Sequence, residues 1–250
     1  MREGKVRLSE EEIAGLNEEQ RAQVCKQWSD ITQSQSIETV CIPLTPFGGD
    51  GFRLLVFPGV WNPLKVSARY HASYLFFNNA RLFRGKRALD ITAGTGILGA
   101  VMAVCGADHV VCADISRVAA ENVLLNMHRG GLDNATSIYQ SDLFENIPPQ
   151  RFDCIVITQP YFCGNPEPGD TIAASMLAPA NLMPRFLEEA KKYLAPDGVI
   201  VSPFYSKGSP EHDPVLLGAR HGYMVETTCV FNATEGMQQG ELSIHELRLS

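Results

Sequence analysis

A glycine-rich turn between an apolar run and a helix-forming run constrains the fold most strongly. The stretch "ALDITAGTGILGA", residues 88–100, carries glycines in the spacing G-x-G-x-x-G at Gly94, Gly96 and Gly99. Glycines in the first turn after a strand let the backbone approach a ligand and let the following helix pack closely. This spacing fits a dinucleotide such as NAD, and it fits S-adenosylmethionine equally well. The turn therefore predicts a nucleotide-binding α/β domain and leaves the ligand open.

Strand and helix patterns alternate from Arg87 onward. Strand-like runs occupy residues 87–91, 109–115, 136–142, 152–158 and 198–204. Helix patterns occupy residues 96–106, 117–129, 180–194 and 211–221. This alternation predicts an α/β fold in which helices cover both faces of a mostly parallel sheet. Two final strand-like runs, 223–231 and 241–249, are typical of a hairpin that adds an antiparallel edge strand. We therefore expect a Rossmann-like, seven-stranded sheet with an antiparallel last strand.

The first part of the chain has a different pattern and predicts an N-terminal cap over residues 1–84, ahead of a cofactor-binding domain over 85–250. A helix is expected from Leu8 to about Ile31, with a second helix beginning at Asn17 as the alternative. Two strand-like runs flank "GGDG" at 48–51, which indicates a hairpin. An amphipathic helix is expected to follow the hairpin.

Charge and composition narrow the function classes. The formal net charge is −7, and no basic face is obvious, so a nucleic-acid substrate is not expected. No apolar run approaches the roughly 18 residues that span a bilayer, and the charged N-terminus shows no secretory signal, so we expect no membrane contact. Seven cysteines lack C-x-x-C spacing, which indicates reduced thiols in a cytoplasmic protein without a metal site. The sequence does not predict an oligomeric state.

Three aspartates bear on the identity of the ligand. Asp114 closes the second strand and can accept hydrogen bonds from the ribose hydroxyls of either candidate. Asp90 ends the first strand, where its carboxylate would repel a pyrophosphate but suits a sulfonium and an ammonium. Asp142, just past the third strand, can accept a hydrogen bond from an adenine amino group or can cap the next segment. Asp90 thus favours S-adenosylmethionine over NAD.

These motifs occur together in a known order. "ALDITAGTGILGAVMAVCGADHVVCADIS", "SDLF", "FDCIVITQPYF" and "FLEEAKKYLAPDGVIVSP" resemble the motifs of class I S-adenosylmethionine-dependent methyltransferases over about residues 85–205. The resemblance implies that Asp90, Gly94 and Gly96 line the methionine part, Asp114 the ribose and Asp142 the adenine. The expected cofactor pocket also includes Thr92, Ile115, Leu143 and Thr158.

The end of the fourth strand holds the catalytic candidates, Thr158, Gln159, Pro160 and Tyr161. "TQPY" resembles the [N/D]-P-P-[Y/F] motif of amino-methyltransferases, including those that methylate a glutamine of peptide release factors, and "FPGVWNP" resembles a segment upstream of their core. In that motif the first residue accepts a hydrogen bond from the target N–H. Here a threonine, which can also donate, replaces it, and the Gln159 amide oxygen could serve in its place.

The acceptor is expected between the cap and the loop 159–180. Tyr70, His71 and Tyr74, from the helix before the core, and Phe162 are the candidate substrate contacts. Because the cap is compact and no long basic or aromatic docking surface is visible in the sequence, we expect N-methylation of a small molecule rather than of a protein. Four alternatives stay open, namely a protein glutamine-type methyltransferase, an O- or C-methyltransferase, an NAD-dependent oxidoreductase and a non-catalytic cofactor-binding protein.

Overall fold

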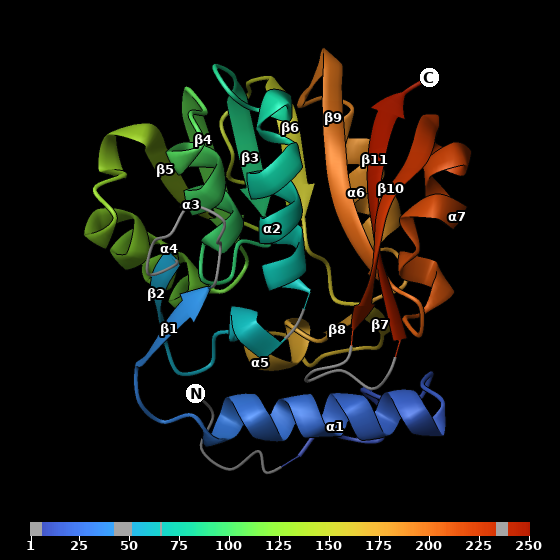
Figure 1. Cartoon of the computed structure of the whole chain (residues 1–250). Helices are drawn as coiled ribbons and strands as arrows, with labels where there is room; N and C mark the ends of the chain where they lie inside the picture. The colour runs from blue at the N-terminus through green and yellow to red at the C-terminus, as the bar shows by residue number, and fades with distance from the viewer. Residues whose placement is uncertain (1–6, 43–51, 66, 234–239) are drawn as a thin grey trace.

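The centre of the molecule is a seven-stranded sheet in the order β10-β11-β9-β6-β3-β4-β5 (Figure 1). The computed structural model describes residues 7–42, 52–65, 67–233 and 240–250. The strands of the sheet are β3 (Arg87–Ile91), β4 (His109–Asp114), β5 (Thr136–Gln140), β6 (Phe152–Ile157), β9 (Leu194–Tyr205), β10 (Tyr223–Ala233) and β11 (Gly240–Leu249). Strands β3, β4, β5, β6 and β9 are mutually parallel, which confirms the predicted Rossmann-like fold class.

The closing hairpin enters the sheet differently from the expectation. Strand β11 is antiparallel to both β9 and β10, so the antiparallel last strand is confirmed. It lies inside the sheet, however, and β10 forms the edge, so the prediction of an antiparallel edge strand is wrong. Burial explains the order. Leu242, Ile244 and Leu247 of β11 are fully buried, whereas Met224 and Val230 of β10 are more than half exposed.

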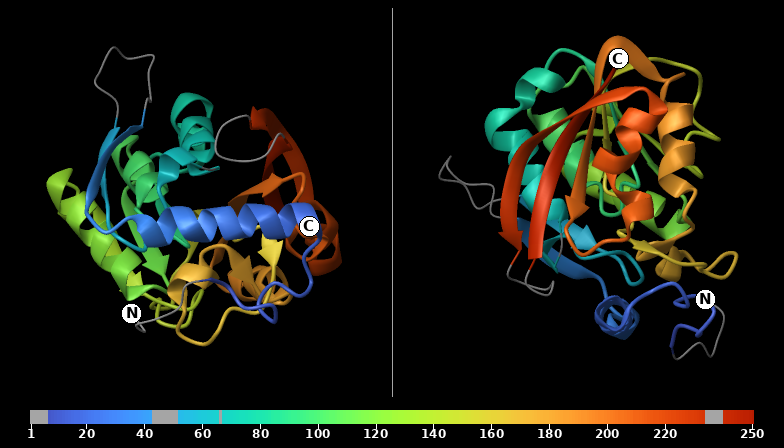
Figure 2. Two further views of the ribbon diagram at one scale, coloured as in Figure 1. Left: turned by 90° about the horizontal axis from the view of Figure 1, so that it is seen from below. Right: turned by 90° about the vertical axis from the view of Figure 1, so that its right-hand side faces the viewer.

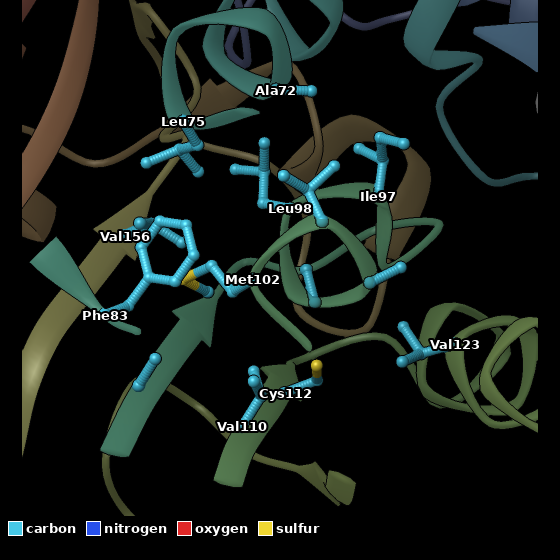
Figure 3. Packing of buried hydrophobic residues seen from close by; sticks show 14 of the residues in the cluster. Ala72, Leu75, Phe83, Ile97, Leu98, Met102, Val110, Cys112, Val123 and Val156 are labelled. Carbon is cyan, nitrogen blue, oxygen red and sulfur yellow. The ribbon is translucent and has the colours of Figure 1, made fainter. Parts of the chain in front are cut away.

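Helices cover both faces of the sheet, and alternation along the strands supplies a core on each face. One apolar cluster joins the sheet to α2 (Ala68–Asn78), α3 (Ile97–Val104) and α4 (Arg117–Arg129). A second joins the opposite face to α6 (Leu182–Ala190) and α7 (Pro214–Gly218). Figure 3 shows the first cluster, in which Ala72 and Leu75 of α2 lie beside Leu98 of α3.

The N-terminal helix follows the shorter of the two predicted ranges, the one that begins at Asn17 and not at Leu8. Helix α1 (Glu18–Gln33) begins at Asn17, where a capping box with Gln20 satisfies the first backbone amides, so the alternative start is confirmed. Ser9 and Glu12 also exchange backbone–side-chain hydrogen bonds, of 2.8 and 3.3 Å. The helix cannot run through Asn17, because that residue adopts an extended conformation with φ −71° and ψ 171°.

The predicted hairpin consists of β1 (Glu38–Ile42) and β2 (Phe52–Val56), which pair antiparallel. Its "GGDG" turn lies outside the described residues. Two buried asparagines of α4 hold β2. Asn122 Oδ1 accepts from the Phe57 amide at 2.9 Å, and Asn126 Oδ1 accepts from the Leu55 amide at 2.8 Å. Asn126 Nδ2 donates to the carbonyls of Leu55 and Thr95, each at 2.9 Å, so one side chain joins the hairpin to the glycine turn.

Helix α1 crosses the edge of the sheet at which the parallel strands end (Figures 1 and 2). Its apolar side, including Val24, Trp28 and Ile31, packs in a third cluster with the segment that follows β6. That segment, expected as a plain loop, contains the paired strands β7 (Phe162–Cys163) and β8 (Leu177–Ala178) and the short helix α5 (Thr171–Ala174). None of the helices in the described part of the chain is long and apolar enough to cross a membrane.

We predict that Asn126→Ala lowers the free energy of unfolding by about 2–4 kcal/mol, since each buried backbone group left unpaired costs roughly 1–3 kcal/mol. Urea denaturation measures the change. Glu121→Ala, at an exposed position of the same helix, is the control and should change stability little. Equal midpoints for the two variants would show that Asn126 does not hold the hairpin.

Candidate active site

A cavity of about 150 Å³ is lined by the residues that follow β3, β4 and β6 and, on the side of α1, by Gln27. One part of its wall is the glycine turn and the start of α4. The other part comes from α1, the segment between β2 and α2, and the segment after β6. The lining includes Gln27, Trp61, Ser67, Thr92, Gly94, Asp114, Ile115, Thr158, Gln159, Pro160, Tyr161, Phe162, Thr171 and Ser175. The carboxyl edge of a parallel sheet is the usual ligand site of such folds.

Asp114 fixes the glycine turn and faces the cavity. Its Oδ2 accepts from the Gly94 amide at 2.9 Å, and its Oδ1 accepts from the Ser116 amide at 2.9 Å. Gly94 has φ +57°, a conformation that glycine adopts without strain. Burial raises the pKa of Asp114, while the two backbone hydrogen bonds lower it. Each carboxylate oxygen keeps a further acceptor site, so Asp114 can bind hydroxyl groups in the cavity.

Asp90 and Gly96 lie behind the turn rather than at the cavity wall. Asp90 is fully buried, and its Oδ2 accepts from the Gly99 amide at 2.8 Å. Burial raises the pKa of Asp90 to about 7. Asp90 is not among the residues that line the cavity, because its side chain lies beneath α3, and its expected role toward the methionine part of the cofactor stays a prediction. Gly96 begins α3, where a Cβ would lie 3.0 Å from Val123.

The two residues after β5 are also outside the cavity lining. Asp142 is partly exposed and lies 3.3 Å from the guanidinium of Arg185. Leu143 is buried in the second cluster, with φ +46°. The end of β5 is nevertheless next to Asp114, whose carbonyl accepts from the Ser141 amide at 2.8 Å. Ile115 lies at the cavity wall and is half exposed.

Three side chains from separate elements meet at the end of β6. Thr92, after β3, has φ +67°, which is strained for a β-branched residue. Its hydroxyl oxygen lies 3.2 Å from both the amide nitrogen and the carbonyl oxygen of Thr158. The Thr158 hydroxyl lies 3.1 Å from Nδ1 of His71, which is fully buried on α2. Burial lowers the pKa of His71 to about 3, so the imidazole is neutral at physiological pH.

The Gln159 side chain turns away from the cavity. Its Nε2 donates to the Pro203 and His212 carbonyls, at 3.0 and 3.4 Å, and its Oε1 accepts from the Ser202 hydroxyl at 3.1 Å. The suggestion that this amide oxygen replaces the missing Asn or Asp is therefore wrong, because the amide is fully engaged inside the protein. Gln159 is nevertheless among the residues that line the cavity.

The aromatic residues of the motif are packed rather than free. Tyr161 and Phe162 line the cavity and are buried in the third cluster. The Tyr161 ring packs edge-on to Phe204, with ring centroids 6.2 Å apart, and burial raises the pKa of its hydroxyl. Tyr161 and Phe162 thus give the cavity a closely packed aromatic wall.

Three of the four candidate substrate contacts do not line the cavity, and one of them, His71, is fully buried beside Thr158. Tyr70 packs against Phe231, with ring centroids 5.1 Å apart, and the Tyr74 hydroxyl donates to Glu246 at 2.8 Å. Neither residue lines the cavity. Sequence reasoning missed Gln27, because only the packing of α1 across the sheet edge brings it to the wall. Trp61 lies in the "FPGVWNP" segment, and the resemblance of that segment to the release-factor enzymes could have identified it as a cavity residue.

The described residues contain no group of three His, Cys, Asp or Glu side chains that could hold a metal ion.

The fold and this cavity define an S-adenosylmethionine-dependent methyltransferase. The chain belongs to the methyltransferase small domain family, whose model matches residues 58–207. A 16S rRNA methyltransferase from Thermus thermophilus, solved with S-adenosylmethionine and guanosine, has the same fold, with a TM-score of 0.59 and 19% identity. The similarity covers 86% of this chain and 50% of that one.

Curated relatives include enzymes assigned to protein glutamine methylation. A Methanocaldococcus jannaschii protein, assigned as a protein N5-glutamine methyltransferase, is 30% identical over 60% of this chain and 75% of its own length. The ribosomal protein uL3 glutamine methyltransferase of Bradyrhizobium diazoefficiens is 29% identical over 46% of this chain and 40% of its own length. These relatives overturn the expectation of a small-molecule partner. A compact cap without a visible basic or aromatic docking surface is therefore no guide to acceptor size.

We predict that Asp114→Ala weakens S-adenosylhomocysteine binding by about 1–3 kcal/mol, the usual cost of leaving buried polar partners unpaired. Isothermal titration calorimetry measures the affinity. Asp108→Ala, at an exposed position at the opposite end of β4, is the matched control and should bind as tightly as the unmodified protein. Unchanged affinity in Asp114→Ala would show that this carboxylate does not hold the ligand.

Proposed function

We propose that this enzyme transfers a methyl group from S-adenosylmethionine to the side-chain amide nitrogen of a glutamine in a protein. Thr158, Pro160 and Tyr161 support this reading, because they occupy the cavity wall at the end of β6, where the amino-methyltransferase motif is expected. The relatives assigned to protein glutamine methylation support the same acceptor.

The two halves of the cavity suit the two substrates. In this proposal the half lined by Gly94, Asp114 and Ile115 holds the adenosyl part, with Asp114 accepting from the ribose hydroxyls. Asp142 lies one strand further along the sheet edge, where a shift of its partner Arg185 would free it for the adenine amino group. When bound, S-adenosylmethionine supplies a methyl group that is activated by its positive sulfur.

The chemical difficulty lies in the acceptor, because the nitrogen lone pair of an amide is delocalised into its carbonyl group. The protein can help by accepting hydrogen bonds from both N–H groups, which orients the nitrogen toward the methyl group. As the N–C bond would form, the methyl–sulfur bond would break, S-adenosylhomocysteine would leave as the neutral thioether, and the surplus amide proton would pass to bulk water as the products leave. We assign one such acceptor to the Thr158 hydroxyl and the other to the Gln159 backbone carbonyl. Tyr161 and Phe162 exclude water beneath them.

The other half of the cavity is proposed to receive the glutamine side chain and the residues around it. Gln27 of α1, Trp61 and Ser175 supply polar and aromatic groups there. The net charge of −7 favours a basic partner, since opposite net charges speed encounter. In this reading residues 1–84 contribute to acceptor recognition, and residues 85–250 bind the cofactor and supply Thr158, Gln159 and Ser175 to the acceptor half. The division is one of function, because α2 shares a core with α3.

The acceptor atom can be tested directly. The full chain is incubated with methyl-labelled S-adenosylmethionine and total ribosomal proteins, and the labelled protein is hydrolysed in acid. N5-methylglutamine releases labelled methylamine on hydrolysis, whereas methyl groups on lysine or arginine stay on the amino acid. We expect labelled methylamine, and a loss of about tenfold or more in the Asp114→Ala reaction at subsaturating cofactor, since the affinity loss carries over to the rate.

Label recovered only as methyl-lysine, only as methyl-arginine or only in RNA would exclude the glutamine assignment. Methylation of protein carboxylates would exclude it as well, because hydrolysis of a methyl ester releases labelled methanol instead of methylamine.

A further inference from the structure

A side chain that contacts Thr158 can decide whether its hydroxyl acts as a hydrogen-bond acceptor at this position. A threonine hydroxyl both donates and accepts, whereas a target N–H needs an acceptor. We propose that His71 is a positioning residue whose bare Nδ1 accepts the hydrogen bond of the Thr158 hydroxyl, so that the Thr158 oxygen offers only lone pairs to the acceptor amide. The proposal rests on the proposed function for the identity of the acceptor, and not for the hydrogen bond itself.

The geometry of the pair carries the first step. His71 Nδ1 and Thr158 Oγ1 are 3.1 Å apart, a normal distance for a hydrogen bond. His71 is fully buried, and no other hydrogen bond within the described residues uses the Thr158 hydroxyl. Because burial holds the pKa of His71 near 3, the ring carries one proton, and one of its nitrogens is bare at physiological pH.

The position of that proton decides what Thr158 can do. If Nδ1 carried it, Nδ1 would donate to Thr158, and the hydroxyl hydrogen would turn into the cavity to face the N–H of the acceptor. If Nε2 carries it, Nδ1 accepts the hydroxyl hydrogen, and the remaining lone pairs of Oγ1 face the cavity. Only the second arrangement serves methyl transfer to an amide. Its cost is that His71 Nε2 has no partner in the described part of the chain.

Thr92 keeps the pair in place. Its hydroxyl holds the Thr158 amide at 3.2 Å, and its backbone adopts φ +67°. Such strain in a β-branched residue persists only where the surroundings enforce it. With the Thr158 main chain fixed by Thr92 and its side chain fixed by His71, the hydroxyl oxygen has one orientation. His71 therefore stands in for the rigidity that an asparagine side chain has at this position in the amino-methyltransferase motif.

The first experiment needs no acceptor. Nitrogen-15 NMR of histidine-labelled protein, bound to S-adenosylhomocysteine, distinguishes a bare ring nitrogen from a protonated one. The chain has six histidines, and the His71 signals are those that disappear in His71→Asn. We expect a bare Nδ1 and a protonated Nε2 at pH 7.5. A protonated Nδ1 would overturn the proposal, whether or not the glutamine assignment holds.

The second experiment uses kinetics with the labelled acceptor. The Oδ1 of asparagine can occupy the place of Nδ1, so His71→Asn should keep kcat within about threefold. His71→Leu should lower kcat by about 10- to 100-fold with little change in cofactor affinity, a range typical of losing one positioning group. Thr158→Val should lose as much, and the double variant should lose no more than either single one.

Leu75→Ala, in the same helix and packed against α3, is the stability control. It should lower the melting temperature without lowering kcat at 25 °C. Equal losses of kcat in His71→Asn and His71→Leu, or additive losses in the double variant, would overturn the proposal. If the preparation methylates another kind of acceptor, the glutamine assignment fails alone, and the NMR result still decides the state of His71.

Discussion

The rest of the site depends on two carboxylates that hold backbone amides at the turn after β3. Asp114 accepts from Gly94 on the cavity side, and Asp90 accepts from Gly99 on the core side, at 2.9 and 2.8 Å. Between these two anchors the chain leaves the sheet and begins α3 within a few residues. The close approach needs glycine, because a Cβ at Gly99 would lie 2.4 Å from the sulfur of Cys112. Because hydrogen bonds hold the turn on both sides, it stays close to the sheet and leaves the cavity open beside Gly94.

The carboxyl edge of the sheet is completed by segments far apart in the sequence. The end of β6 brings Thr158 between Thr92 on one side and His71 on the other. Helix α1 then closes the cavity from outside, packing its apolar side on the segment after β6. Thr158 lines the cavity, and its hydroxyl lies 3.1 Å from a buried, neutral imidazole. In the proposed function this residue is shared by the cofactor half and the acceptor half.

Much of this architecture was predictable, because local patterns decide it. The apolar runs and the glycine turn predict the sheet and its crossing helices, and α4 begins and ends where its pattern does. The position of β11 inside the sheet was not predictable in this way, since two strands of similar pattern compete and only the packing of Leu242 and Ile244 selects the inner one. The start of α1 was not predictable either, because Ser9 with Glu12 and Asn17 with Gln20 both form capping-box hydrogen bonds, and only the second pair begins the helix.

The site was less predictable than the fold, because side-chain direction follows from the whole structure. Asp90 binds the Gly99 amide inside the protein and does not line the cavity, and the local pattern of β3 does not specify that contact. The Gln159 amide binds Ser202, which is distant in sequence. His71 was among the candidates, yet its contact with Thr158 crosses 87 positions of the chain, and no local pattern contains it.

The way α1 is attached has an evolutionary consequence. It forms no part of the sheet, and it meets the rest of the molecule through apolar side chains of the third cluster and a few polar contacts. Residues on its inward face can therefore drift or be exchanged while the turn that holds the nucleoside stays untouched. Descendants of one ancestral enzyme could diverge in which macromolecule they modify and still keep the same donor.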